Sequence, residues 1–301
     1  MRPVTRSPTV TDARLTRCST TRMRDPRGAM DGPATRPDPA RWTGEGLTAA
    51  WLGHATVLLD LCGVRILTDP ALGERIGVHL GGPVVLGPRR LVAPALRAGE
   101  LGRVDLVLLS HAHMDHTDLW TLRHLPRETP VVAAPGMDDL LRRFRHRTLL
   151  RWGASVRVAG VEVTAVPVRH WGARTVWDRH RGFGGYLLGR EGRRVLFAGD
   201  TAYTPELARA VAARPPELAI LPIGAYDPWI WNHASPEQAW RMFRETGGAY
   251  LMPVHHATFR LSREPAGEPL ARLRAAAAAE GAGDRIVGAA LGETVTLPAP
   301  R

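Results

Sequence analysis

Short apolar runs that end at glycines dominate the first part of the hydrophobic pattern. Residues 47–52, 56–61 and 64–68 form three such runs, and Gly53 and Gly63 separate them. Apolar runs of this length, bounded by turn residues, are typical of β-strands. Later runs of the same kind predict strands over 104–109, 131–134, 156–158, 161–168, 184–188, 194–198, 218–222, 250–254 and 295–297.

Helical patterns lie between the later strands. Within 136–147, Met137, Leu140, Leu141 and Phe144 recur at helical spacing, which predicts an amphipathic helix. Other helices are expected over 118–125, 236–244 and 266–280, and after the capping sequence Thr204-Pro205-Glu206. The alternation of strand pairs with helices is typical of an α/β layered fold.

Two segments lack a regular pattern. Residues 70–100 are rich in glycine and proline, and a loop of this length is expected either to cover a pocket mouth or to run over the surface. Residues 1–41 are rich in Arg, Thr, Pro and Asp and poor in large apolar residues, so they are expected to be a disordered N-terminal extension. Residues 42–301 are expected to form one domain.

Composition narrows the possible classes of protein. The extension has no apolar signal-peptide core, and no run of about 18 apolar residues occurs, so neither a secretory signal nor a transmembrane segment is expected. The two cysteines, Cys18 and Cys62, form no disulfide framework, which favours a cytoplasmic location.

The charge of the chain is strongly positive. All 40 basic residues are arginines, and the formal net charge is +11. Such a charge is compatible with nucleic-acid binding. The arginines are spread along the chain, however, and no basic stripe with interleaved aromatic residues occurs, so no nucleic-acid partner is expected.

One stretch concentrates the residue types that bind metals. The run 104–109 ends in His111, His113, Asp115 and His116. Imidazole and carboxylate groups bind zinc and other late first-row divalent ions. In a turn after a strand, the first two side chains reach one point and the last two reach a neighbouring point. The spacing therefore predicts two adjacent metal sites.

Three sequence motifs resemble the metallo-β-lactamase superfamily. They are His111-Ala112-His113-Met114-Asp115-His116, Trp51-Leu52-Gly53-His54-Ala55-Thr56 and Leu67-Thr68-Asp69-Pro70. The last two resemble the branch that contains the N-acyl-phosphatidylethanolamine-hydrolysing phospholipase D and the ascorbate-phosphate lactonase. The resemblance covers residues 47–298 and implies a four-layer αββα sandwich, with the site at one edge between the two sheets.

The resemblance also implies a ligand set for two divalent ions, expected to be zinc. His170, Asp200 and His255 each follow a predicted strand, as the central motif does. One ion would be held by His111, His113 and His170, and the other by Asp115, His116 and His255, with Asp200 as the bridge. His255 is preferred over His256 by the register of the strand before it. His54 and Asp69 are expected either to brace strand ends or to support the ligands.

A later loop implies residues for substrate binding and catalysis. The segment Gly224-Ala225-Tyr226-Asp227-Pro228-Trp229-Ile230-Trp231-Asn232-His233 resembles an aromatic loop of the phospholipase D branch. Tyr226, Trp229 and His233 are therefore predicted to bind substrate, although packing is an equal alternative for the tryptophans. His233 and Asp115 are the candidate catalytic residues, and His233 would protonate a leaving group or bind a phosphate oxygen.

The expected function is metal-dependent hydrolysis by a metal-bridged hydroxide. A phosphodiester, with a small-molecule or lipid-like substrate, is the leading expectation, and lactone opening is nearly as well supported. Iron-dependent oxygen chemistry and nucleic-acid binding are weaker alternatives. The oligomeric state is left open.

Overall fold

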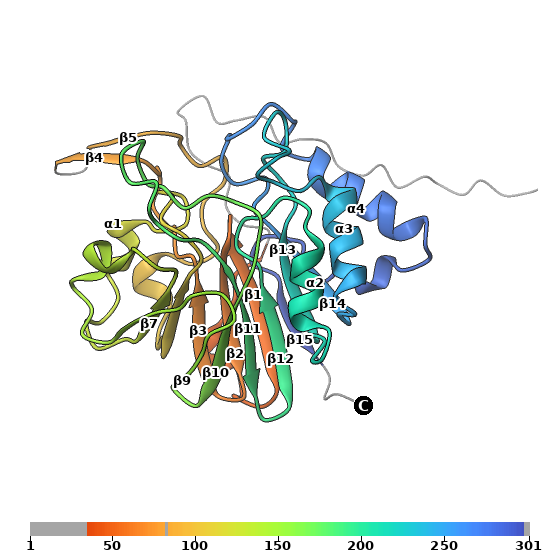
Figure 1. Cartoon of the computed structure of the whole chain (residues 1–301), viewed down its shortest axis with the longest axis horizontal. Helices are drawn as coiled ribbons and strands as arrows, with labels where there is room; N and C mark the ends of the chain where they lie inside the picture. Colours follow the sequence, from red (N-terminus) through yellow and green to blue (C-terminus); the bar gives the residue numbers. More distant parts are fainter. Residues whose placement is uncertain (1–34, 82–83, 298–301) are drawn as a thin grey trace, which may run out of the picture.

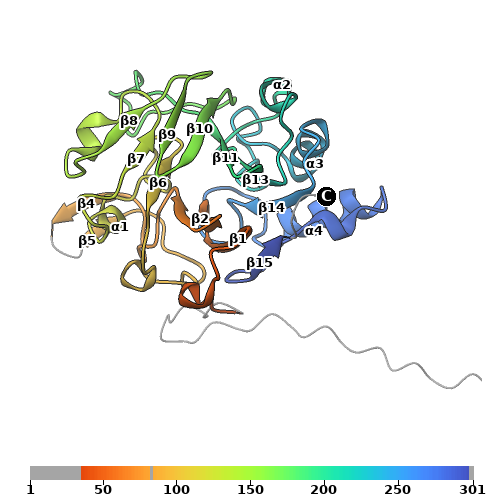
Figure 2. The same cartoon turned by 90° about the horizontal axis from the view of Figure 1, so that it is seen from below.

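Two β-sheets packed face to face form the centre of the molecule (Figures 1 and 2). The computed structural model describes residues 35–81 and 84–297. One sheet has seven strands in the order β15-β1-β2-β3-β6-β7-β8, and the other has six in the order β14-β13-β12-β11-β10-β9. The seven-stranded sheet contains β1 (Leu47–Gly53), β2 (Thr56–Leu61), β3 (Val64–Thr68), β6 (Leu106–Leu109), β7 (Val131–Ala133), β8 (Arg147–Leu149) and β15 (Thr294–Leu297). The six-stranded sheet contains β9 (Ser155–Val158), β10 (Val161–Val166), β11 (Gly185–Arg190), β12 (Arg193–Phe197), β13 (Leu218–Pro222) and β14 (Tyr250–Val254).

The inner faces of the two sheets share one apolar core. Leu59, Ile66 and Leu108 of the first sheet pack in the same buried cluster as Phe197 and Ile220 of the second. All five side chains are fully buried, and each contributes about 1.5–3 kcal/mol of hydrophobic stabilisation. This core holds the two sheets at a fixed separation. The separation determines the geometry of the candidate site, because its residues come from strand ends of both sheets.

Helices cover the outer faces unequally. The outer face of the six-stranded sheet packs against α2 (Pro205–Val211), α3 (Pro236–Glu245) and α4 (Glu268–Ala278). Figure 2 shows these helices on one side of the molecule. The other outer face is covered by the single-turn α1 (Leu119–Leu122) and by loops. The expected α/β architecture of two sheets between helical layers is confirmed, with one layer much thinner than the other.

The main error of the sequence-based prediction lies in 136–147, where a helix was expected. The chain instead forms a short 3-10 helix, Asp138–Leu141, and then enters β8. Strand β8 pairs in parallel with β7, from Arg147↔Val131 to Leu149↔Ala133. Pairing with β7 satisfies the backbone hydrogen-bonding groups of β8. The side chains of Leu141 and Phe144 are still buried, as the helical pattern predicted. Tertiary pairing therefore overrides a helical pattern that was correct about burial.

Three other segments also differ from expectation. The helix expected over 118–125 is the shorter α1, capped by Asp118, and the segment 70–100 contains a hairpin of β4 (Val78–Gly81) and β5 (Val84–Leu86). The expected disordered extension falls largely on residues 1–34, outside the described part of the chain. Its last residues do have regular structure, because Pro39–Arg41 forms a 3-10 turn. The remaining 3-10 helices are Ala98–Glu100 and Gly283–Arg285.

No helix within residues 35–81 and 84–297 has both the length and the apolarity needed to cross a bilayer.

Candidate metal centre

The predicted ligands gather at one edge of the molecule, where strand ends from both sheets meet. The histidine-rich loop begins directly after β6, Asp200 lies just beyond β12, and His255 follows β14 immediately. The segments that follow β12 and β6 lie close together here. A Cβ on Gly199 would be only 2.4 Å from the Cβ of Ser110. Gly199 also has a φ of +61°, so glycine is required on both counts.

The first group of ligand atoms comes from His111, His113 and His170. His111 Nε2 lies 2.8 Å from His113 Nδ1, and His170 Nε2 lies 3.3 Å from the same atom. The three nitrogens face one point, and these three residues form one of the groups able to hold a metal ion. The structure therefore brings together the three residues that were predicted to share the first ion.

Hydrogen bonds on the far side of two of the rings, those of His111 and His170, fix their orientation. His111 Nδ1 lies 2.8 Å from the Ser110 hydroxyl oxygen, which in turn donates to Asp69 Oδ2 at 2.5 Å. His170 Nδ1 donates to the carbonyl of Asn232 at 3.0 Å. With Nδ1 occupied in this way, Nε2 of each ring is left as the free ligand atom, which is the usual arrangement of metal-binding histidines.

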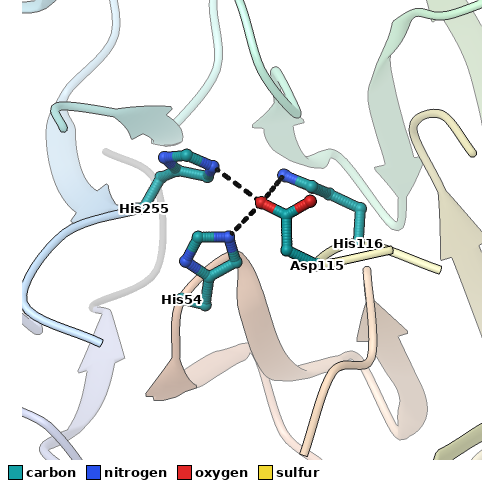
Figure 3. Close-up of side chains that lie close together, drawn as sticks. All are labelled: His54, Asp115, His116 and His255. Atoms are coloured by element: carbon teal, nitrogen blue, oxygen red, sulfur yellow. Dashed lines mark hydrogen bonds and ion pairs between the residues drawn. The ribbon is translucent and has the colours of Figure 1, made fainter. Parts of the chain in front are cut away.

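The second group surrounds the carboxylate of Asp115. Asp115 Oδ2 lies 2.8 Å from His54 Nε2, 3.5 Å from His255 Nε2 and 3.6 Å from His116 Nε2 (Figure 3). Asp115, His116 and His255 are the residues predicted to hold the second ion. His54 is the addition, because sequence analysis gave it only a bracing or supporting role. Its sequence signal was the motif from Trp51 to Thr56, which resembles one branch of the superfamily but did not mark His54 as a ligand.

Asp69 links the two groups from behind. Its Oδ2 lies 2.6 Å from His116 Nδ1, and its Oδ1 accepts the Ser110 amide at 2.7 Å. One fully buried carboxylate therefore directs His116 and, through the Ser110 hydroxyl, also His111. His54, Asp69 and His255 all have positive φ values, a strained conformation that persists where the surrounding structure imposes it.

Asp200 lies between the two groups. Its Oδ2 is 3.0 Å from His255 Nε2 and 3.1 Å from His116 Nε2, both of the second group. The same oxygen is 3.8 Å from His170 Nε2 of the first group and 3.7 Å from His233 Nδ1. A single carboxylate oxygen is thus close to four imidazoles that come from separate elements.

Burial and charge shift the titration of these groups. Burial alone would raise the pKa of Asp200, but the imidazoles of His116, His255 and His233 outweigh it and hold the pKa well below its usual value. Burial and the neighbouring His116 hold the pKa of His111 well below normal, and burial does the same for His170. Ionised carboxylates and neutral imidazoles are the protonation states that bind metals, so Asp200, His111 and His170 are already in the required state. In the second group burial alone would lower the pKa of His116 and His255, but the carboxylates of Asp200 and Asp115 outweigh it. They raise the pKa of His116 and raise that of His255 to about 9, so these imidazoles would lose a proton when a cation binds.

Several ligand atoms have no hydrogen-bonding partner. Among the described residues, His116 Nε2, His255 Nε2 and Asp200 Oδ1 are buried without one. An unsatisfied buried polar group costs about 1–3 kcal/mol. This cost, together with the oriented donor set, fits residues that hold divalent cations.

The remaining predicted residues have different surroundings. His233 is mostly buried, and its ring centroid lies 5.3 Å from that of His255 and 5.0 Å from that of His170. It therefore belongs to the cluster, although sequence analysis placed it outside the ligand shell. His256 lies apart, because its ring stacks on Trp51 at 4.6 Å.

The two aromatic residues predicted to bind substrate also differ from each other. Trp229 is exposed, whereas Tyr226 is buried and its hydroxyl donates to Glu268 at the start of α4. The structure thus directs Tyr226 towards a helix and leaves Trp229 on the surface.

A cavity of about 340 Å³ adjoins the second group. His54 and His255 form part of its wall, and Phe259, Leu261 and Glu264 line the rest with their neighbours. Such a volume is in the range of small-molecule sites. A substrate group of moderate size can therefore reach the cluster from this side.

Comparisons with known proteins agree with this geometry. The family model described as the beta-lactamase superfamily domain matches residues 64–256. An uncharacterized protein of Mycobacterium tuberculosis is 35% identical over 265 residues, which cover 84% of this chain and 70% of that protein. The N-acyl-phosphatidylethanolamine-hydrolyzing phospholipase D 1 of Caenorhabditis elegans is 29% identical over 234 residues, which cover 71% of this chain and 65% of that protein.

A solved structure shares the fold. The isothiocyanate hydrolase from Delia radicum gut bacteria superimposes with a TM-score of 0.68 at 21% identity, covering 84% of this chain and 99% of that one. The match of the family model, the shared fold and the ligand cluster at the sheet edge lead to one conclusion. This chain belongs to the β-lactamase superfamily and is a metal-dependent hydrolase with the metallo-β-lactamase fold.

Proposed function

We propose that the chain holds two divalent ions, most suitably zinc, and hydrolyses a phosphodiester. His111, His113 and His170 would hold the first ion, and Asp115, His116 and His255 the second. Two such ions supply a water of lowered pKa and neutralise charge on a phosphoryl oxygen. Imidazole and carboxylate ligands suit zinc, although they also suit iron.

The observation that carries the two-ion proposal is the position of Asp200. Its Oδ2 lies within 3.8 Å of Nε2 atoms from both groups, and its Oδ1 is buried without a partner. Two cations held close together repel each other, and an anion between them reduces that repulsion. Asp200 is therefore proposed as the shared ligand of the two ions.

The residues of the chain have distinct tasks in this proposal. Asp69 and Ser110 hold His116 and His111 in the orientation that presents Nε2. Burial lowers the pKa of His233 to about 4, so its imidazole is neutral near pH 7. A neutral imidazole donates one hydrogen bond, and we assign that bond to a phosphoryl oxygen of the substrate. This role is favoured over proton donation to a leaving group, which needs a higher pKa.

The choice of a phosphodiester rests on two supports. The aromatic loop that carries His233 resembles the phospholipase D branch, and a Caenorhabditis elegans relative carries that activity in its name. His233 also adds a buried nitrogen donor beside Asp200, suited to the charged oxygens of a phosphate. Lactone opening remains the alternative, because the same ions would polarise a carbonyl oxygen.

One experiment tests ions and substrate on the same sample. Elemental analysis by mass spectrometry of the purified chain should find close to two equivalents of zinc. Nitrophenyl phosphodiesters and lactones are then assayed before chelation, after it, and after zinc is restored. The proposal expects diester hydrolysis that chelation abolishes and zinc restores. Hydrolysis of lactones alone would favour the alternative substrate, and iron with oxygen consumption would contradict hydrolysis.

A further inference from the structure

The β4–β5 hairpin exposes an apolar face. Val78 pairs with Leu86, and Val84 lies two residues before Leu86 on β5, so these three side chains lie on one side of the hairpin. Leu80 lies where the pairing shifts register between His79 and Gly81, and it is exposed as well. The exposed fraction is 47% for Val78, 64% for Leu80, 55% for Val84 and 67% for Leu86. Figure 1 shows the hairpin projecting from the body of the molecule at the upper left. A protruding strand pair with one apolar, uncovered side is unusual for a surface that faces only water.

Exposed tryptophans lie on the loops around the metal centre. Trp171 directly follows His170 and its ring centroid lies 4.7 Å from that of His113, while Trp229 and Trp231 precede His233. Trp177, on the loop between β10 and β11, is 90% exposed, and Trp231 is 72% exposed. Tryptophan is enriched at membrane–water interfaces because its ring is apolar and its N–H is polar.

Positive charge accompanies these tryptophans. Arg169 and Arg179 are both exposed, on the same loop as Trp177. Neither forms an ion pair with any residue in the described part of the chain. The Arg169 guanidinium carbon lies 5.9 Å from the ring centroid of Trp231. The loop that carries His170 therefore also carries exposed tryptophans and arginines without ion pairs to the described residues.

We propose that this edge of the molecule docks onto an anionic lipid surface. The apolar hairpin face and Trp177 would enter the headgroup region, and Arg169 and Arg179 would face lipid phosphates. The combination favours a lipid surface over a second copy of the chain. Apolar side chains without charge would suit self-association, whereas the exposed arginines on the loop that carries Trp177 complement an anionic interface. The docking does not depend on which ester the metal centre hydrolyses. It would place the centre next to the lipid surface.

Vesicle sedimentation with the full-length chain tests the hairpin. The wild type should sediment with vesicles that contain phosphatidylglycerol, should bind phosphatidylcholine vesicles less, and should lose affinity as salt rises. In the double variant Leu80→Thr, Leu86→Thr, strand propensity is kept and the apolar side chains are removed. Its partition should weaken by about 10- to 100-fold. The control pair Leu80→Val, Leu86→Val should bind within about threefold of wild type, because the face stays apolar.

Tryptophan fluorescence tests the depth and the orientation of docking. Lipids brominated near the headgroup should quench the wild-type emission on binding, and Trp177→Phe should lose part of that quenching while metal content is unchanged. Equal binding of the Thr and Val pairs would overturn the proposal, as would failure of the wild type to bind anionic vesicles. A dimer that dissociates only in the Thr pair, in sedimentation velocity without lipid, would assign the hairpin to self-association and also overturn it.

Discussion

The two sheets contribute to the metal centre in different ways. The seven-stranded sheet supplies four predicted ligands from a single loop after β6, within the six residues from His111 to His116. The six-stranded sheet supplies its ligands one at a time, with His170, Asp200 and His255 each following a different strand. We call the ligands from the loop after β6 the local half of the centre, because they are close in sequence. The other half, His170, Asp200 and His255, comes together only when three strand ends are aligned in the fold.

The two halves also differ in how their side chains are held. Asp69 and Ser110 fix His116 and His111 through buried hydrogen bonds. In contrast, His255 Nδ1 is buried without a partner, and His255 is positioned by a left-handed backbone that donates its amide to His54. The difference indicates that side-chain hydrogen bonds orient His111 and His116, whereas backbone conformation and packing orient His255. Substitutions can break each half separately.

The largest expected effect comes from Asp200, where the two halves meet. Asp200→Asn keeps the shape but removes the charge that would be shared by two cations. We expect kcat/KM to fall by about a thousandfold or more, equivalent to roughly 4 kcal/mol of transition-state stabilisation, and bound metal to fall below two equivalents. Steady-state kinetics and elemental analysis measure both.

A surface variant controls for that substitution. Asp138→Asn removes an exposed carboxylate that pairs with Arg147 and belongs to none of the groups able to hold a metal ion. It should keep normal metal content and activity. If Asp200→Asn also kept two equivalents of metal and normal rates, the two halves would not share that carboxylate.

The next effect separates two adjacent histidines. His255→Ala should lose about one equivalent of metal, because its Nε2 faces both Asp115 and Asp200. His256→Ala should keep both equivalents but lose stability, since its ring stacks on Trp51 in the interior. Deleting a buried ring of this size costs about 2–4 kcal/mol of unfolding free energy. Elemental analysis and thermal unfolding distinguish the two, and the opposite pattern would place the ligand one residue later.

A smaller effect is expected at His233, which belongs to neither predicted ligand group. His233→Ala should leave both ions bound. If its imidazole hydrogen-bonds a phosphoryl oxygen, KM for diesters should rise and lactones should be unaffected. If it protonates the leaving group instead, kcat should fall by about 10²–10⁴-fold for poor leaving groups and little for nitrophenolate. Kinetics on one poor and one good leaving group decide between these roles, and wild-type constants with both would exclude His233 from the chemistry.

The smallest effect should come from Asp69, which supports ligands without facing the proposed ions. Asp69→Asn weakens the hydrogen bond that directs His116 Nδ1, so metal affinity should fall by about 10- to 100-fold. Full metal content should return at high zinc concentration, unlike that of His255→Ala. A competition titration with a chelator measures the affinity, and a loss that excess zinc does not rescue would indicate that Asp69 supports the fold itself.

The ligand candidates from His111 to His116 could be predicted from their spacing in the sequence. Those that follow single strands, such as His170 and His255, could be predicted only through the family resemblance. The spacing from His111 to His116 already indicates two neighbouring sites. A single histidine such as His170 carries no such signal, because the other two histidines of its group are more than 50 residues away. His54 was underestimated for the same reason: its contact with Asp115 joins residues 61 positions apart. The helix expected over 136–147 failed because pairing with β7 decides that backbone, and the pattern of buried residues fits either structure.

The location of the centre on the seam between two sheets has a consequence for folding. Contacts between distant residues form slowly, because a long chain segment must be closed before they stabilise anything. The second group needs His255, which leaves the ribosome long after the loop from His111 to His116. A growing chain that has passed β10 already contains the three histidines of the first group, but it lacks both Asp200 and the last histidine. A chain truncated before β14 would therefore bind a single ion at most, and the proposed second ion could be held only after β14 has docked.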